Sequence, residues 1–211
     1  MTLRSLIMFA VGDAYVYQIG DRPMGDVNYA EPSDEDKRHL PVPVGAGDAA
    51  RFRTRCVGCM KCISVCPSGI LRPSSTAGHF GRPALDFRYG WCRPECNLCA
   101  EACPAGAIRR GLTPERKKAL HTGIAVWHGE RCVAATGKDK CNACARHCPV
   151  GAISLVTKDG AAADAPKIPK IDADKCIGCG ACEHLCPARP MPALTVKAYE
   201  RHREIWPANM K

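Results

Sequence analysis

Cysteine is the residue type whose number and spacing in this 211-residue chain indicate chemistry. The 16 cysteines fall into four runs of four, and a proline follows the last cysteine of each run. The runs are Cys56, Cys59, Cys62 and Cys66; Cys92, Cys96, Cys99 and Cys103; Cys132, Cys141, Cys144 and Cys148; and Cys176, Cys179, Cys182 and Cys186. Runs 1 and 4 have the C-x2-C-x2-C-x3-C-P spacing that binds iron–sulfur cubes, because the first three thiols can reach three iron corners from one loop. We therefore predict that all 16 thiols are ligands of four [4Fe–4S] clusters.

Runs 2 and 3 are stretched before their second cysteine. Run 2 has three residues between Cys92 and Cys96, and run 3 has eight between Cys132 and Cys141. Both keep C-x2-C-x3-C-P at their end, and lengthening a loop costs little entropy. We expect each run to bind a full cluster; the alternative for run 3 is a three-iron cluster or none. When two clusters share a module, the last cysteine of each run ligates the cluster of the other run.

Disulfides and zinc are the other common uses of clustered cysteines. Disulfide frameworks scatter their cysteines along a chain, whereas each of these runs is compact at its end and closed by Cys-Pro. A structural zinc site pairs two C-x2-C units and does not need a third thiol in the same loop. The ligand spacing therefore favours iron–sulfur clusters over both alternatives.

The formal net charge of +9 would suit binding to nucleic acid or to an anionic membrane surface. However, an oxidised cube with four thiolates carries about −2, so four cubes would bring the loaded protein close to neutral. The basic residues are also scattered along the chain rather than gathered in one run. Charge compensation of the clusters is the simpler explanation, and we expect no nucleic-acid partner.

The sequence contains no dinucleotide-binding glycine fingerprint, no P-loop and no recognisable nucleophile–base pair. We therefore expect an electron-transfer subunit with no catalytic residue and no small-molecule substrate of its own. It would relay single electrons between a donor and a partner oxidoreductase or quinol module, either in solution or in a membrane-associated complex. The alternative is a maturation or assembly factor for a partner metalloenzyme that uses its clusters structurally.

The elements that position these thiols must be short, because the runs lie close together. A Gly-Ile or Gly-Ala-Ile segment follows Cys-Pro in runs 1 to 3, which predicts a turn away from a cube and an isoleucine over its face. Thr113 and Pro114 predict the N-cap and first residue of a helix that ends near His121. Strands are expected at residues 14–19, 84–91, 123–127 and 193–197, and residues 151–156 and 168–172 are expected to form a hairpin.

These elements predict an α+β fold of two ferredoxin-like 2[4Fe–4S] modules with short strands, short helices and long loops. The four-cluster domain is expected at residues 51–198, followed by a tail at 199–211. Residues 1–50 form an extension, either a docking arm for a partner or a surface-packed segment, and residues 40–47 have the Pro/Gly composition of an extended linker.

Because no cysteine is missing from any run, His147 and His184 are expected beside the ligands rather than among them. Trp91 and Trp127 precede runs and are expected to cover cluster faces.

The four Cys-Pro runs, the Tyr-Gly-Trp-Cys lead into run 2 and the widened run 3 resemble the four-cluster subunits of the dimethyl-sulfoxide-reductase β-subunit type, over residues 40–198. Within that family the chain looks most like the NapG/MauM-like ferredoxin branch of polyferredoxins. The resemblance implies that runs 1 and 4 share one module and runs 2 and 3 the other, although runs 3 and 4 with their hairpin would also form a ferredoxin module.

The NapG/MauM-like branch implies a periplasmic location. The apolar stretch at residues 5–11 is too short to span a bilayer and lacks a cleavage site, which favours the cytoplasm.

Overall fold

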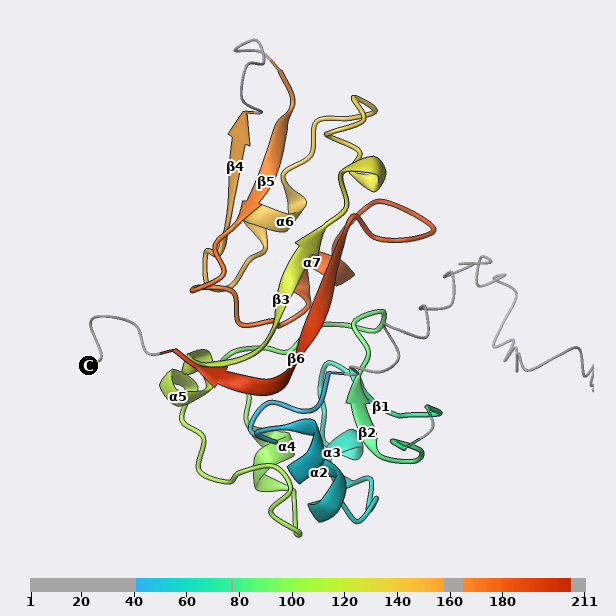
Figure 1. Cartoon of the computed structure of the whole chain (residues 1–211), viewed down its shortest axis with the longest axis vertical. Coiled ribbons are helices and arrows are strands. Elements are labelled where there is room, and N and C mark those ends of the chain that lie inside the picture. The colour runs from blue at the N-terminus through green and yellow to red at the C-terminus, as the bar shows by residue number, and fades with distance from the viewer. Residues whose placement is uncertain (1–40, 77, 158–164, 206–211) are drawn as a thin grey trace, which may run out of the picture.

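The computed structural model describes residues 41–76, 78–157 and 165–205 (Figure 1). Its elements are α2 (Ala49–Arg55), α3 (Lys61–Ser64), β1 (Leu71–Pro73), β2 (Pro83–Leu85), α4 (Leu98–Glu101), α5 (Pro114–Ala119), β3 (Leu120–Trp127), a 3-10 helix (Gly129–Arg131), α6 (Ala143–Arg146), β4 (Ile153–Thr157), β5 (Lys167–Ile171), α7 (Ala181–His184) and β6 (Leu194–Glu204). Short helices and short strands joined by loops agree with the α+β prediction. The strand expected at 14–19 lies outside the described residues.

A one-turn helix carries the third cysteine of every run. Cys62 lies in α3, Cys99 in α4, Cys144 in α6 and Cys182 in α7. Helix α3 packs against α4, and α6 packs against α7. The chain therefore has two modules, module 1 (residues 41–112, with runs 1 and 2) and module 2 (residues 123–198, with runs 3 and 4).

Three two-stranded antiparallel sheets support the modules. In module 1, β1 pairs with β2 so that Leu71 faces Leu85. In module 2, β4 and β5 form the predicted hairpin, and Ile153 faces Ile171. The third sheet pairs β3 with β6, which joins the segment before run 3 to the segment after run 4. Figure 1 shows this sheet between the β4–β5 hairpin and module 1.

Helix α5 begins where its capping residues predict. Thr113 Oγ1 accepts a hydrogen bond from Arg116 N at 3.3 Å, and Pro114 is the first helical residue. The helix ends at Ala119, slightly before the predicted end, because Leu120 takes up an extended conformation and starts β3. This direct change from helix to strand makes β3 longer than the predicted strand at 123–127.

Residues 41–48 belong to the core of module 1, so the interpretation of residues 40–47 as an extended linker was wrong. Val42 is 3% exposed and Ala46 is fully buried. Pro41 O accepts a hydrogen bond from Leu85 N at 2.8 Å, and Gly45 O accepts one from Arg109 N at 3.1 Å. Small apolar residues here fill space beside the cysteines, as a linker would not.

The C-terminal strand β6 continues to Glu204, beyond the predicted domain end at residue 198. Its last residues reach back to module 1, where His202 N donates to Gly47 O at 2.7 Å and Arg201 forms a β-bridge with Asp48. By contrast, the strand expected at 84–91 stops at Leu85. Asp86 Oδ1 accepts a hydrogen bond from Arg88 N at 3.1 Å and starts a turn there.

Candidate iron–sulfur centres

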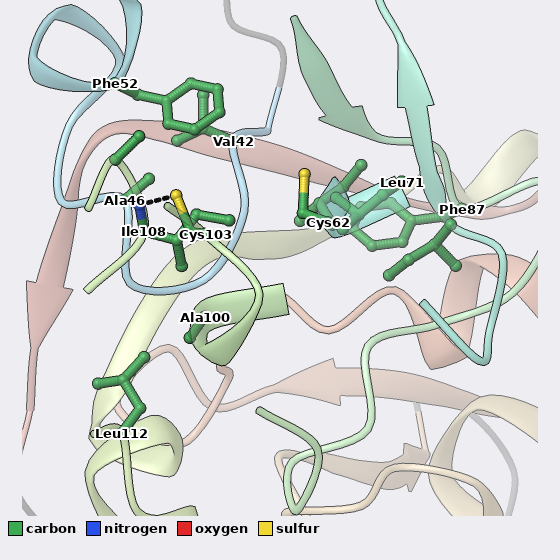
Figure 2. Packing of buried hydrophobic residues seen from close by; sticks show 13 residues of the cluster. Val42, Ala46, Phe52, Cys62, Leu71, Phe87, Ala100, Cys103, Ile108 and Leu112 are labelled. Carbon is green, nitrogen blue, oxygen red and sulfur yellow. Dashed lines mark hydrogen bonds between the residues drawn. The ribbon is translucent and has the colours of Figure 1, made fainter. Parts of the chain in front are cut away.

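The first group of thiols combines run 1 with the last cysteine of run 2. An open hollow is lined by Cys56, Cys59, Cys62 and Cys103. Phe52 and Ile108 line the same hollow. Figure 2 shows Phe52 above Cys103 and the hydrogen bond from Ile108 N to Cys103 Sγ, which is 3.5 Å long. We call these four thiols set 1.

A hollow in module 2 repeats this arrangement. It is lined by Cys176, Cys179 and Cys182 of run 4 and by Cys148, the last cysteine of run 3. Ile153 lies on this hollow as Ile108 lies on the first. We call these thiols set 4.

The remaining thiols form two further groups. Cys66, Cys92 and Cys99 pack against the core of module 1, and the charges of Cys96 and Cys66 both act on Cys92; these four are set 2. In module 2, Cys132, Cys141 and Cys186 pack in one cluster, and the charges of Cys141 and Cys132 act on Cys144; these four are set 3. Each set therefore takes three thiols from one run and the last cysteine of its module partner.

Burial makes several of these thiols hard to ionise without a cation. Desolvation, with smaller contributions from neighbouring cysteines, raises the pKa of Cys62 to about 11 and that of Cys99 to about 12. In module 2, desolvation likewise raises the pKa of Cys144 to about 11 and that of Cys179 to about 12. Thiols of this kind suit a cationic iron core, which would stabilise the thiolates and displace their protons.

Backbone N–H groups point at the sulfur atoms of the last cysteines of runs 2, 3 and 4. Ala152 N lies 3.2 Å from Cys148 Sγ, and Ala193 N lies 3.2 Å from Cys186 Sγ, in addition to the bond at Cys103. The glycine after Cys-Pro turns the backbone as predicted, with φ of 63° at Gly69, 60° at Gly106 and 61° at Gly151. Such N–H donors stabilise a charged sulfur and tune the potential of a bound cluster.

All 16 cysteines are free thiols in the structure. Among the residues that it describes, no three Cys, His, Asp or Glu side chains converge closely enough to hold a single metal ion. The thiols of sets 1 and 4 surround hollows instead. Their chemistry and placement fit a four-cornered cluster.

Several known proteins are similar to this chain in sequence. Residues 55–107 and 139–189 both match the family described as 4Fe-4S dicluster domain. The methylamine utilization ferredoxin-type protein MauM of Methylobacillus flagellatus is 36% identical over 147 residues, which are 68% of this chain and 62% of that protein. MauM of Methylorubrum extorquens is 32% identical over 161 residues, 75% of this chain and 73% of that protein. The ferredoxin-type protein NapG of Haemophilus influenzae is 32% identical over 153 residues, 70% of this chain and 54% of its own length.

The chain belongs to the ferredoxin-type 4Fe–4S proteins. The relatives named here are all ferredoxin-type proteins. The chain spans only 62% and 54% of the length of the M. flagellatus and H. influenzae relatives.

The ferredoxin-type modules pair neighbouring runs. One dicluster match covers runs 1 and 2, and the other covers run 4 with the last three cysteines of run 3. The structure agrees, because α3 packs on α4 and α6 on α7. The pairing of run 1 with run 4 and of run 2 with run 3, which the larger family implied, is therefore not the one adopted here. The alternative module of runs 3 and 4 is confirmed.

A buried lysine of the ferredoxin-type protein lies beside set 2. Lys117 is 6% exposed, and its Nζ donates to Arg93 O at 2.6 Å and to Cys96 O. Burial raises the pKa of Cys92, and the Lys117 ammonium opposes that effect. Sequence reasoning treated Lys117 as one of several scattered cations. Its position in the helix predicted after Thr113, four residues before the buried His121 and Thr122, was the available signal.

The two modules of the ferredoxin-type protein meet at sets 2 and 4. Cys92 N donates a hydrogen bond to Cys179 O at 2.9 Å, so one ligand loop contacts the other directly. His184 Nδ1 lies 3.1 Å from Phe87 O, and its ring centroid lies 5.5 Å from that of Trp91. His184 thus contributes to the junction rather than to a thiol set, as expected. Trp127 packs against both cysteine groups of module 2, while Nδ1 of His147 lies within hydrogen-bonding distance of Ala143 O.

No helix in the described part of the ferredoxin-type chain is long and apolar enough to cross a bilayer.

Proposed function

We propose that this ferredoxin-type protein holds four [4Fe–4S] clusters and relays single electrons between a donor and a partner oxidoreductase or quinol module. Sets 1 to 4 would be the ligands: Cys56, Cys59, Cys62 and Cys103; Cys66, Cys92, Cys96 and Cys99; Cys132, Cys141, Cys144 and Cys186; Cys148, Cys176, Cys179 and Cys182. The widened loop of run 3 supports a full set, because Cys132 packs with Cys141 and Cys186. When bound, each cube supplies the capacity to accept and return one electron.

The observation that carries the proposal is the order of the thiol sets through the molecule. Sets 1 and 2 share the core of module 1, and sets 3 and 4 share α6 and α7. The Cys92–Cys179 hydrogen bond connects set 2 to set 4. The chain therefore lines up its sets in the order 1, 2, 4, 3, without a gap between the modules. A structural use of clusters would not need such an unbroken row.

The names of two relatives refer to methylamine utilization. By analogy we propose a redox protein as the partner of this chain, and neither nucleic acid nor a small substrate.

A potentiometric titration followed by EPR tests the relay against the assembly-factor alternative. We expect reversible one-electron reduction of every cluster, with S = 1/2 signals broadened by interaction between neighbouring centres. Clusters that stay in one redox state across the physiological window would contradict a relay and favour an assembly factor.

A further inference from the structure

The thiol set at one end of the row reaches the surface. Cys59 of set 1 is exposed, whereas the other 15 cysteines are buried or partly buried. Set 1 also ends the order 1, 2, 4, 3, on the side of module 1 away from the junction. A partner that exchanges electrons with this chain must bring its own redox group close, and at this end no side-chain layer separates the ligand from solvent.

The surface around Cys59 is apolar. Val57 is 71% exposed and Met60 is 37% exposed, and both belong to the run 1 loop. Phe80, 77% exposed, comes from the β1–β2 loop. The two loops approach each other, since a Cβ built on Gly58 would lie 4.0 Å from Gly81 O. All large hydrophobic residues that are exposed in the described parts of the chain belong to module 1: Val57, Met60, Val65, Phe80, Tyr89 and Leu98. Exposed apolar residues gathered in this way mark interaction sites.

The charged side chains of the same region are all basic. The chain has no Asp or Glu between residues 49 and 85, where it has six basic residues: Arg51, Arg53, Arg55, Lys61, Arg72 and Arg82. Arg55 and Lys61 are exposed and flank the run 1 loop. Neither forms an ion pair within the described residues. The loop of set 3 differs, because Glu130 and Asp139 alternate there with lysine and arginine.

We propose that the surface formed by Val57, Cys59, Met60 and Phe80, edged by Arg55 and Lys61, docks an acidic face of a redox partner protein. We call it the Cys59 surface. Its basic rim would steer an acidic partner into encounter, and its apolar centre would exclude water over the exposed ligand. Small interfaces of this kind are typical of transient electron-transfer complexes. The inference rests on the proposed function and adds the point of contact and the charge of the partner.

Binding of two redox proteins of opposite charge tests this proposal. Plastocyanin serves as the acidic probe and cytochrome c as the basic probe, each titrated by calorimetry into the cluster-loaded full chain at low ionic strength. We expect plastocyanin to bind, and Arg55→Glu/Lys61→Glu to weaken that binding by about tenfold or more. Phe80→Ser should weaken it without changing the charge. The matched control Lys167→Glu/Lys170→Glu changes the charge equally at two exposed residues of β5 and should leave the affinity within about twofold.

Iron content is measured first for each variant, and Phe80→Ser, outside the cysteine runs, tests the surface if the charge reversal loses iron. Four results would each overturn the proposal. Both charge reversals could weaken binding equally, Phe80→Ser could have no effect, cytochrome c could bind more tightly than plastocyanin, or ultracentrifugation could show a homodimer formed through this surface.

Mixing the reduced protein with plastocyanin separates the Cys59 surface from the relay, since one electron converts copper(II) to copper(I). If plastocyanin copper is reduced but the variants bind plastocyanin as tightly as the unmodified chain does, the Cys59 surface is rejected and the relay is kept. Failure to reduce either probe rejects the relay itself.

Discussion

At the scale of single residues, Lys117 is a buried positive charge placed where negative charge would accumulate. Its Nζ is fixed by the carbonyl oxygens of Arg93 and Cys96 beside set 2. Burying an ammonium is costly unless it is compensated, so its position argues for an anionic neighbour. Thiolates on an iron core would be that neighbour.

Replacing Lys117 by methionine should lower the reduction potential of the cluster at set 2. Reduction adds negative charge, which the ammonium stabilises, so its loss should shift the potential down by about 60 mV or more, a tenfold change in a one-electron equilibrium. EPR-monitored titration measures the shift. Lys118→Met is the matched control, because Lys118 is exposed and carries the same charge. Equal shifts in both variants would show that burial of Lys117 has no special effect.

His202 should make the folded state sensitive to acid. Desolvation lowers its pKa to about 4, and neither ring nitrogen has a hydrogen-bond partner among the described residues. The folded state therefore resists protonation that the unfolded state accepts near pH 6.5. Stability is retained above pH 6.5 and lost as the pH falls towards 4, with the largest slope between these values. His202→Leu should flatten the fall in apparent melting temperature between pH 7 and 5, whereas His147→Gln should leave it unchanged.

At the scale of elements, the exchange of last cysteines between runs can be tested by counting iron in paired variants. Cys66 belongs with Cys96 in set 2, although it is closer in sequence to Cys59 of set 1. Cys66→Ala/Cys96→Ala should therefore lose one cluster, and Cys66→Ala/Cys59→Ala should lose two, leaving about 12 and about 8 iron atoms per chain. If each run held its own cluster, the two counts would be reversed.

Local signals in the sequence predicted most elements, and non-local contacts explain those that it missed. Thr113-Pro114 determines the start of α5, and the two segments expected at 151–156 and 168–172 pair as the β4–β5 hairpin. The burial of residues 41–48 depends on Leu85 and Arg109, which no local pattern reveals. The ligand positions followed from spacing alone. The pairing of runs did not, because all four runs end alike and only the packing of α3 on α4 and α6 on α7 separates the alternatives.

At the scale of the whole molecule, the junction between modules depends on close backbone approach. Gly180 has a φ of 81°, and a Cβ built there would lie 2.0 Å from the Phe87 ring. Phe87 belongs to module 1 and its carbonyl meets His184. A glycine at this position allows the run 4 loop to rest on module 1.

Substituting Gly180 should loosen the junction. Gly180→Ala adds a clash of roughly 1–3 kcal/mol to the strain of a positive φ. Gly137→Ala is the matched control, since Gly137 has a φ of 70° and open space around it. We expect a clearly lower apparent melting temperature for Gly180→Ala than for Gly137→Ala, and narrower EPR lines from weaker interaction between modules. Equal melting temperatures would contradict the close contact.

The central claim is that 16 thiols hold four cubes in one row. Its most direct test is the iron and acid-labile sulfide content per chain after anaerobic purification. Four cubes predict about 16 of each. About 12 of each would mean that one set, most simply that of the widened run 3, stays empty and the row is broken. Zinc without sulfide would contradict the account as a whole.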